Sequence, residues 1–439
     1  MKQPAAAKKL LEKIGQKKAR VGIIGLGYVG LPLGVEFVRA GFEVIGVDVD
    51  ANKIKAVQQG KSYLVDLTDD EIQETLATGR LRVSTRYADL AKADAVSITV
   101  PTPLRKSKDP DVSFIQQAVE GLSKVIRPGT LVVLESTTYP GTTRELVEAR
   151  LEKEGLLSGE NLFVAFSPER IDPGNMVWKT RNIPKVVGGT TPEATELAAA
   201  LYAGAVERVV RVGSSEEAEM VKLLENTFRA VNIALVNELM LMCDRMGIDV
   251  WNVIGAAATK PFGFMPFYPG PGIGGHCIPL DPMYLAWRAR AYDYTNRFIE
   301  LATDINGNMP RFVLNKAARL LSRKRKKALK GARVLLLGMA YKPGVTDTRE
   351  SPGLEVLRLL EREGARVAYS DPHVPVLIEG EKKLRSQKIT PKALASCDLA
   401  VLLTAHPEFD YPLIARHAPL VLDTRNAFGE APSSRVERL

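Results

Sequence analysis

The feature that most constrains the fold is a glycine-rich turn between two short apolar runs near the N-terminus. Residues 21–25 (VGIIG) enter the motif GLGYVG at 25–30, a helical pattern follows, and residues 43–47 form a second apolar run. In a turn of this kind the first glycine permits the bend, the second admits a pyrophosphate, and the third lets helix and strand pack closely. We therefore expect a parallel βαβ unit with a dinucleotide at the N-terminus of its helix.

Asp48 ends the second run, 18 residues after Gly30, and strengthens this prediction. Its carboxylate can bind the adenosine ribose hydroxyls and would repel a 2′-phosphate, which favours NAD over NADP. Later strands also end in polar residues, and a doubly wound sheet binds ligands at the carboxyl ends of its strands. The cofactor-binding candidates from these patterns are Gly25, Gly27, Tyr28, Val29, Gly30, Asp48, Pro101, Thr102, Ser136 and Thr137.

The same arrangement occurs again in the last third of the chain. Residues 333–338 (RVLLLG) run into a glycine, and an apolar run at 366–369 follows a helical pattern. Further apolar runs of strand length are 95–100, 131–134, 162–166 and 185–188. Strands that alternate with helices in this way predict α/β folding, with a doubly wound parallel sheet at each end of the chain.

A long helical stretch separates these two regions. Ser214-x-x-Glu217 is typical of a helix start and Gly247 of a helix end, which gives about 33 residues and a rod of about 50 Å. We expect this spine helix to join the two α/β domains. Its apolar stripe, which we expect to pack against a second subunit, is Val231, Leu235, Leu239 and Met242.

Two shorter helix starts can be predicted from capping patterns. Thr142-x-x-Glu145 follows a Pro-Gly turn and matches the capping box, in which the two side chains bond each other's backbone N–H groups. Thr191 before Pro192 predicts an N-cap with proline at the first helical position.

Composition excludes several classes of protein. Of the 439 residues, 45% are hydrophobic and 25% are charged, which excludes a disordered or fibrous chain. No apolar run approaches the roughly 18 residues of a membrane span, and residues 1–20 lack the apolar core of a secretory signal. Three scattered cysteines and four histidines form no cluster with metal-ligand spacing. We expect a cytoplasmic protein without a membrane segment and without zinc.

The net charge of +9 is concentrated in two segments, residues 8–20 and 323–327. No aromatic residues interleave with the basic ones, so nucleic-acid binding gains little support. We interpret both segments as solvated helix surface.

The most unusual segment is the glycine loop at 270–281 (GPGIGGHCIPLD). Four glycines within six residues leave the backbone open to a close ligand, and Cys277 at the end of the loop is placed like a nucleophile. The neighbouring His276 is a weaker candidate for a base, because adjacent side chains point apart. Cys243 and Cys397 have no such context and are expected to be buried packing residues.

The order of motifs along the chain resembles the UDP-glucose/GDP-mannose dehydrogenase family almost from end to end. The motifs are GLGYVG, Ser136-Thr137 with Pro140-Gly141, Ser167-Pro168-Glu169, Lys222-x-x-x-Asn226, GGHCxPxD at 274–281 and DTRES at 347–351. The stretches 226–238 and 261–270 are most similar to the UDP-N-acetylglucosamine 6-dehydrogenase branch.

This resemblance implies two Rossmann-like doubly wound domains joined by a central helical domain with a long spine helix. The implied domains are an NAD-binding domain at 1–212, a dimerisation domain with the cysteine loop at 213–312, and a UDP-sugar-binding domain at 313–439. A homodimer or higher homo-oligomer is implied, with a UDP-sugar as the partner molecule and without membrane or nucleic acid.

The resemblance also implies a four-electron oxidation of a sugar C6 alcohol to a carboxylate with two NAD⁺. Lys222 and Asn226, four apart on a helix, could both reach one developing oxyanion, and Asp281 could orient Lys222 or a water. Cys277 would attack the aldehyde to give a thiohemiacetal and then a thioester. Glu169 is the candidate base for hydrolysis, with Thr137 placing the water.

Binding residues are carried over at matching positions. For NAD the resemblance adds Lys53 and Arg349 to the residues named above. For the nucleotide sugar it implies Glu169, Arg170, Lys222, Asn226, Tyr268, Gly272, Gly274, Gly275, Lys342 and Arg425.

Two departures bear on the substrate. UDP-glucose dehydrogenases commonly carry lysine where this chain has Leu280, and Phe-Leu where it has Arg170-Ile171. Both favour a 2-acetamido sugar, and we expect UDP-N-acetylglucosamine oxidation for surface polysaccharide synthesis. UDP-N-acetylmannosamine, UDP-glucose and GDP-mannose remain alternatives, as does a regulatory protein without turnover, against which Cys277 argues. A 3-hydroxyacid dehydrogenase would leave Cys277 and the second α/β domain unexplained.

Overall fold

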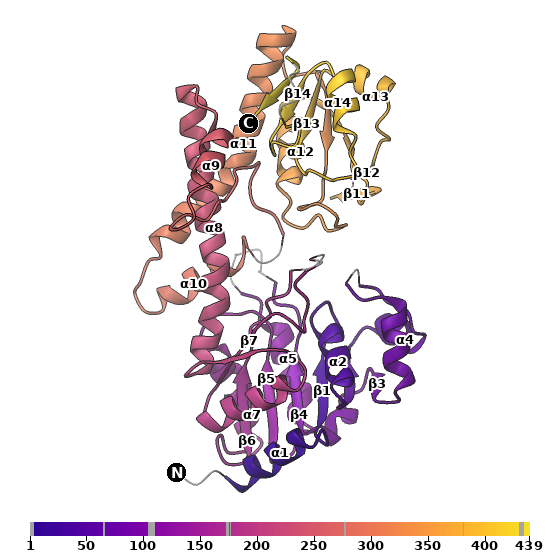
Figure 1. Cartoon of the computed structure of the whole chain (residues 1–439), viewed down its shortest axis with the longest axis vertical. Coiled ribbons are helices and arrows are strands. Elements are labelled where there is room, and N and C mark those ends of the chain that lie inside the picture. The colour runs from indigo at the N-terminus through magenta and orange to yellow at the C-terminus, as the bar shows by residue number, and fades with distance from the viewer. Residues whose placement is uncertain are drawn as a thin grey trace. The chain divides into compact units, whose positions relative to one another are not determined.

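The computed structural model describes residues 4–64, 66–103, 110–172, 175, 177–275, 278–380, 382–429 and 434–439 (Figure 1). The chain forms two compact units, Met1–Glu225 with Arg290–Tyr292, and Asn226–Ala289 with Asp293–Leu439. The boundary falls inside helix α8, Ser215–Met246. The sequence predicted three domains, with boundaries after residues 212 and 312. That division stays a prediction, because the structure separates into two units.

The first unit contains an eight-stranded sheet in the order β3-β2-β1-β4-β5-β6-β7-β8 (Figure 1). Strands β1 to β6 are parallel, and β7 pairs antiparallel with β6. Consecutive strands move outward in opposite directions from β1, which is the topological switch point where such sheets bind ligands. The strands are β1 Arg20–Ile24, β2 Glu43–Val47, β3 Leu81–Ser84, β4 Ala95–Ile98, β5 Thr130–Leu134, β6 Leu162–Phe166, β7 Lys185–Gly189 and β8 Val209–Arg211.

Helices cover both faces of this sheet because alternate strand residues point to opposite faces. Leu131 and Val133 of β5 belong to a core with α1, α2 and α7, whereas Val132 and Leu134 belong to a core with α5, η2 and the start of α8. Short continuous apolar strands of this kind are typical of parallel sheets buried on both faces. The helical segments are α1 Ala5–Gly15, α2 Gly30–Arg39, α3 Ala51–Gln58, α4 Asp69–Ala77, η1 Tyr87–Lys92, α5 Ser113–Ser123, η2 Thr143–Glu148, α6 Ala149–Glu152 and α7 Pro192–Ala203.

The second unit has a five-stranded parallel sheet in the order β10-β9-β13-β14-β15, and a small hairpin of β11 and β12. Helices α11 and α12 share a core with one face of this sheet, and α13 and α14 with the other. The strands are β9 Arg333–Leu337, β10 Arg366–Ser370, β11 Val376–Glu379, β12 Lys382–Arg385, β13 Leu399–Leu402, β14 Val421–Asp423 and β15 Val436–Arg438. The helices are α9 Val250–Ala257, α10 Asp281–Arg290, α11 Arg297–Arg325, α12 Pro352–Arg362, α13 Pro391–Ser396 and α14 Tyr411–His417.

These elements confirm the predicted fold class, including both glycine-turn units. Helix α8 begins after Ser214, whose hydroxyl accepts from the Glu217 N–H at 3.2 Å, and it ends before Gly247 at φ +69°. Thr191 caps α7 by accepting from the Ala194 N–H. The predicted capping box at Thr142 is wrong. Its hydroxyl bonds the Tyr139 carbonyl, and a carboxylate from α8 binds the N–H groups at the start of η2 instead.

The apolar stripe of α8 is largely exposed in the single chain. Leu235, Leu239 and Met242 have 52%, 37% and 48% of their surface accessible, which leaves the predicted subunit contact uncovered within the described residues. Among the helices that the structure describes, none is long and apolar enough to cross a membrane.

Candidate active site

The glycine turn after β1 has the geometry that a bound dinucleotide requires. Gly25 has φ +95°, and a Cβ there would lie 2.9 Å from the Thr99 carbonyl oxygen. A Cβ on Gly30 would lie 2.0 Å from the Gly25 carbonyl oxygen, so these two positions exclude side chains. A Cβ on Gly27 would meet no protein atom within 4 Å. The turn is therefore packed at its first and third glycines and open at its second, as expected for close approach of a pyrophosphate.

Helix α2 starts directly at this turn, behind Val29, whose side chain offers no hydrogen-bond acceptor. The Leu31 N–H donates to the Gly27 carbonyl at 3.2 Å and Pro32 has no N–H, so this helix start offers a ligand chiefly the positive end of the helix dipole. The Asp48 carboxylate is buried beside the turn and accepts from the N–H groups of Leu26 at 2.7 Å and Asp50 at 2.9 Å. Lys53 Nζ lies 3.1 Å from Asp48 Oδ2, so both residues sit where the ribose was predicted.

The other predicted cofactor residues of this unit follow β4 and β5. Thr102 Oγ1 donates to the Thr137 carbonyl at 2.6 Å, and Ser136 Oγ donates to the Val100 carbonyl at 2.6 Å. These bonds join the loops after the two strands at the carboxyl edge of the sheet, next to Pro101. The open Gly27 position and the buried Asp48 carboxylate beside it fit NAD.

A buried ionic network lies at the same edge. Lys185 Nζ is 2.5 Å from Glu135 Oε2 and 3.0 Å from Glu169 Oε2, and the Tyr202 hydroxyl donates to Glu135 Oε1 at 2.6 Å. Glu169 Oε1 also accepts from the N–H groups of Arg170 and Ile171, each at 2.7 Å. Burial alone would raise the pKa of Glu169, but the charge and hydrogen bond of Lys185 hold it below its usual range. Glu169, the predicted base, is therefore a fixed carboxylate.

Helix α8 brings Lys222 to this network. Lys222 is buried, and its positive charge contributes to the lowered pKa of Glu169. Arg170, a predicted substrate residue, is held by ion pairing with Glu225 at 2.7 Å and by a bond from its Nη1 to the Pro184 carbonyl at 2.8 Å. Arg170 thus fixes the segment that carries Glu169 against α8.

Glu219 ties the same part of α8 to the loop after β5. Its carboxylate is fully buried and accepts from the Gly141 N–H at 2.6 Å and from the Thr143 N–H and hydroxyl at 2.8 and 2.7 Å. Burial raises the pKa of Glu219 to about 7, against the effect of these three bonds. This contact positions the loop that follows Thr137.

In the second unit, two motifs far apart in sequence meet. Asn226 Nδ2 of α8 donates to Asp281 Oδ2 at 2.5 Å, and both side chains are buried. Asp281 is the first residue of α10 and follows Cys277 by four positions. Cys277 and His276 lie outside the residues that the structure describes, so their predicted roles stay predictions.

The glycine loop packs against the C-terminal sheet's loops. The Gly270 N–H donates to Asn237 Oδ1 at 2.9 Å, and the Gly275 N–H donates to the Arg349 carbonyl at 3.1 Å. Cβ atoms on Gly274 or Gly275 would lie 2.8 or 2.7 Å from Tyr341 side-chain atoms. Gly272, at φ +126°, faces Pro352 in the same way. The glycines are thus needed for packing, and their role in ligand access stays a prediction.

Four other predicted ligand residues lie in the second unit. Arg425 Nε donates to the Leu403 carbonyl at 2.8 Å, and burial lowers the pKa of Arg425 to about 10, which favours an anionic partner for its guanidinium. Lys342 Nζ lies 5.8 Å from the centre of the Tyr341 ring. Arg349 pairs with Asp347 at 2.7 Å, and Tyr268 stacks on Trp251 with ring centres 6.2 Å apart.

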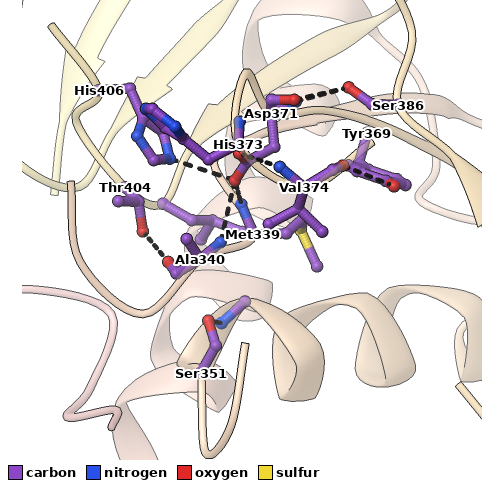
Figure 2. Close-up of polar contacts among 12 residues, drawn as sticks. Met339, Ala340, Ser351, Tyr369, Asp371, His373, Val374, Ser386, Thr404 and His406 are labelled. Atoms are coloured by element: carbon purple, nitrogen blue, oxygen red, sulfur yellow. Dashed lines mark hydrogen bonds and ion pairs between the residues drawn. The ribbon is translucent and has the colours of Figure 1, made fainter. Parts of the chain in front are cut away.

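Sequence reasoning missed a second buried aspartate. Figure 2 shows Asp371, which follows β10 as Asp48 follows β2. It accepts from the N–H groups of Met339, Ala340, His373 and Val374 at 2.6–3.0 Å and contacts His406 Nε2 at 3.1 Å. The repeat of the glycine-turn pattern was the signal that could have revealed it. Lys185 and Glu135 were also missed. Lys185 is the first residue of the predicted apolar run 185–188, and Glu135 directly follows the run 131–134.

The structure brings together two of the four histidines, contrary to the sequence-based expectation of no cluster. His373, His406 and Glu408 have potential ligand atoms within 4.8 Å of one another. His406 is already engaged on both ring nitrogens, because Nδ1 accepts from the Gly344 N–H at 3.4 Å and Nε2 faces Asp371. These bonds favour a structural role for His406.

Comparison with known proteins agrees with this geometry. Three models of the UDP-glucose/GDP-mannose dehydrogenase family match: its NAD binding domain at 19–206, its central domain at 216–308 and its UDP binding domain at 335–430. UDP-N-acetyl-D-glucosamine 6-dehydrogenase of Pseudomonas aeruginosa is 37% identical over 398 residues, covering 90% of this chain and 92% of that protein. UDP-N-acetyl-D-mannosamine dehydrogenase of Pyrococcus horikoshii is 35% identical over 429 residues, covering 95% and 98%.

Solved structures show the same similarity. The structure of UDP-D-ManNAc dehydrogenase from Pyrococcus horikoshii matches with a TM-score of 0.87 and 32% identity, covering 95% of this chain and 98% of that one. The structure of NDP-N-acetyl-D-galactosaminuronic acid dehydrogenase from Methanosarcina mazei Go1 matches with a TM-score of 0.85 and 29% identity, covering 100% and 97%.

Proposed function

Because the chain belongs to the UDP-glucose/GDP-mannose dehydrogenase family and is an NAD-dependent nucleotide-sugar dehydrogenase, we propose that it oxidises C6 of UDP-N-acetylglucosamine to the carboxylate. The observation that carries this proposal is the contact between Asn226 and Asp281. It joins the motif on α8 to the end of the glycine loop, four residues after Cys277. An alcohol-to-acid oxidation needs an oxyanion-stabilising group and a nucleophile in one place.

In this proposal the first unit holds NAD, which supplies the hydride acceptor for both oxidation steps. Asp48 and Lys53 bind the adenosine ribose, and the turn around Gly27 with the N-terminus of α2 binds the pyrophosphate. The loops after β4 and β5 orient the nicotinamide end through Thr102 and Ser136. In the second unit, Arg425 and Lys342 bind the UDP diphosphate, whose charge complements the buried guanidinium.

The first oxidation turns the C6 alcohol into an aldehyde by loss of a proton and a hydride. Lys222 and Asn226 stabilise the developing negative charge on the C6 oxygen, and Asp281 fixes the orientation of the Asn226 amide. An aldehyde cannot lose a second hydride directly. The Cys277 thiolate therefore adds to the carbonyl carbon, and loss of the second hydride from this thiohemiacetal leaves a thioester.

Hydrolysis of the thioester releases the acid and restores the thiol. A water must attack the thioester carbonyl while a carboxylate accepts its proton. Glu169, which is buried at the carboxyl edge of the sheet, fulfils this role, and Thr137, in the loop joined to Thr102, helps to place the water.

The choice of sugar rests on similarity. The relatives include a UDP-N-acetyl-D-glucosamine 6-dehydrogenase and UDP-N-acetyl-D-mannosamine dehydrogenases at nearly equal identity. Leu280 and Arg170-Ile171 disfavour plain UDP-glucose. UDP-N-acetylmannosamine is the second candidate, since the two sugars differ only in the configuration at C2. We propose a role in surface polysaccharide synthesis for either product.

NADH formation with a panel of nucleotide sugars tests the proposal. We expect two NADH per UDP-N-acetylglucosamine consumed and much slower reaction with the mannosamine, glucose and galactosamine analogues and with GDP-mannose. One NADH per sugar would contradict the acid-forming chemistry. Faster turnover of another nucleotide sugar would show that this sugar, and not UDP-N-acetylglucosamine, is the preferred substrate. Cys277→Ala should abolish acid formation, and a normal rate of acid formation in that variant would exclude covalent catalysis.

We also propose a homodimer formed through α8. Its stripe of Leu235, Leu239 and Met242 is exposed at helical spacing, and large exposed apolar stripes mark protein contacts. Sedimentation velocity tests this. The wild type should sediment as a dimer or a larger assembly, whereas Leu235→Glu with Leu239→Glu should sediment as a monomer.

A further inference from the structure

Lys185 is a buried charge to which the proposed mechanism gives no direct role. It is the first residue of β7, and β7 runs antiparallel to β6 with Phe166 opposite Gly188. Continuing that register past Phe166 brings Lys185 opposite Glu169. The first residue of β7 therefore lies at the edge of the sheet where β5 and β6 end, which is the edge that binds ligands.

The network is charged and almost inaccessible to solvent. Side-chain exposure is 6% for Lys185, 0% for Glu135 and 11% for Glu169. Glu135, Glu169 and Lys185 together carry one net negative charge, and Lys222 acts on Glu169 with a further positive charge. Burial would lower the pKa of Lys185, but the charges of Glu135 and Glu169 raise it overall, so the ammonium persists at neutral pH.

The groups that face Glu169 come from four elements. Lys185 approaches from β7 and Glu135 from the end of β5, while Tyr202 of α7 donates to Glu135. Lys222 of α8 contributes its positive charge, and the backbone N–H groups of residues 170 and 171 hold Oε1. Lys185 gives the one side-chain hydrogen bond to Glu169 Oε2 within the described part of the chain.

We propose that Lys185 is a positioning residue for the hydrolytic half of the reaction, fixing Glu169 as the carboxylate that accepts a proton from water. The inference rests on the proposed function, in which Glu169 activates that water. Without the ammonium, Glu135 and Glu169 would be two buried carboxylates in contact with one site. Such a pair takes up a proton at higher pH and shares it, so Glu169 would lose both its charge and its fixed orientation.

The experiment compares Lys185→Met, Lys185→Arg and the double variant Lys185→Met/Glu135→Gln. In Lys185→Met we expect a rapid burst of two NADH per active site followed by steady-state turnover slowed about tenfold or more. The apparent pKa of the acid limb in its plot of kcat against pH should rise by about one unit or more. Lys185→Arg should stay within about threefold of wild type, because it keeps the cation. The double variant restores the net buried charge and should return the acid limb toward wild type.

Several outcomes would overturn the proposal. They are an acid limb unchanged in Lys185→Met, loss of the burst itself, or a double variant no better than the single one. Binding of NAD⁺ by calorimetry shows that the first unit of each variant is folded. Should Lys185→Met fail to fold, Glu135→Gln tests the same point, because it keeps the cation beside Glu169. The apparent pKa of its acid limb should be equal to or lower than that of wild type. A higher apparent pKa would contradict the proposal.

A readout without turnover separates this inference from the proposed function. Infrared difference spectra between about pH 5 and about pH 8 report carboxyl protonation directly. Beyond the Glu219 signal that wild type shares, Lys185→Met should show a second protonated carboxyl signal, and this signal should change when Glu169→Gln is added. Its appearance supports the role of Lys185 even if no tested sugar is oxidised, and its absence argues against that role even in an active enzyme.

Discussion

The two glycine turns of the molecule share one construction and differ in what they leave for a ligand. Gly25 and Gly338 both have positive φ, at +95° and +85°. A Cβ on either would strike the carbonyl of a threonine after the neighbouring strand, at 2.9 Å and 2.4 Å. In each turn the next N–H donates to an aspartate that follows the second strand, Asp48 or Asp371.

The difference lies in the helix and the aspartate. Helix α2 begins at Gly30 with no capping side chain on Val29, whereas α12 begins at Pro352 and is capped by Ser351, whose hydroxyl accepts from the Gly353 N–H. Asp48 bonds two backbone N–H groups, whereas Asp371 bonds four and also His406. The first turn keeps an open position at Gly27 and an aspartate with fewer backbone partners, whereas the second turn uses its helix cap and its aspartate for its own structure.

The largest expected contrast comes from replacing each aspartate by asparagine. Each oxygen of Asp371 accepts from two backbone N–H groups. In asparagine one oxygen is replaced by an NH₂ group, which would face two N–H donors and leave them without an acceptor. We expect Asp371→Asn to lower the free energy of unfolding by about 3–5 kcal/mol, since each buried unsatisfied donor costs about 1–3 kcal/mol. Urea unfolding followed by circular dichroism measures this.

Asp48→Asn is the matched control in the other turn. It should destabilise the chain by about 1–2 kcal/mol, because fewer donors are left unpaired. Its main effect should be weaker NAD⁺ binding and less discrimination against NADP⁺. Equal stability losses for the two variants would show that the turns are equivalent in structure. An unchanged cofactor preference would remove Asp48 from the ribose site.

The stability of the fold at low pH gives a second test of the Asp371 contacts. Burial would raise the pKa of Asp371, but the bonds from His406 and from the backbone N–H groups of Ala340, Met339 and His373 lower it to about 2, from 3.8 when unfolded. A carboxyl with a depressed folded-state pKa stabilises the fold above its unfolded pKa and loses that contribution as the pH falls. We expect about 2 kcal/mol to be lost between about pH 4 and pH 2. Unfolding of wild type and Asp371→Asn over this range measures it, and parallel curves would contradict the assignment.

Much of this organisation could be predicted from sequence because it depends on local patterns. The strands around Gly25 and Gly338 are continuous apolar runs, and the ends of α8 follow from Ser214 and Gly247. The buried network of Lys185, Glu135 and Glu169 could not be predicted, since it depends on β7 running antiparallel to β6. The failed capping box at Thr142 has a similar cause, because Glu219, a residue distant in sequence, binds the Gly141 and Thr143 N–H groups, and the Thr142 N–H donates to the Tyr139 carbonyl.

Gly27→Ala separates ligand access from folding in the first turn. A Cβ there meets no protein atom within 4 Å, so the free energy of unfolding should change by less than about 0.5 kcal/mol. The added methyl would occupy the space reserved for the pyrophosphate, and NAD⁺ affinity should fall by about tenfold or more. Calorimetric titration measures this. Gly30→Ala is the contrasting variant, because its Cβ would lie 2.0 Å from a backbone oxygen and both stability and binding should be lost.

The smallest expected effect tests the closed helix end of the second turn. Ser351→Ala removes the hydroxyl that accepts from the Gly353 N–H at the start of α12. Loss of an N-cap of this kind costs about 1 kcal/mol, and NAD⁺ affinity should not change, because the proposed cofactor site does not include α12. Thermal unfolding with and without NAD⁺ checks both statements. A weakened NAD⁺ affinity in this variant would mean that the second turn also contributes to the cofactor site, and the proposed division between a binding turn and a structural turn would fail.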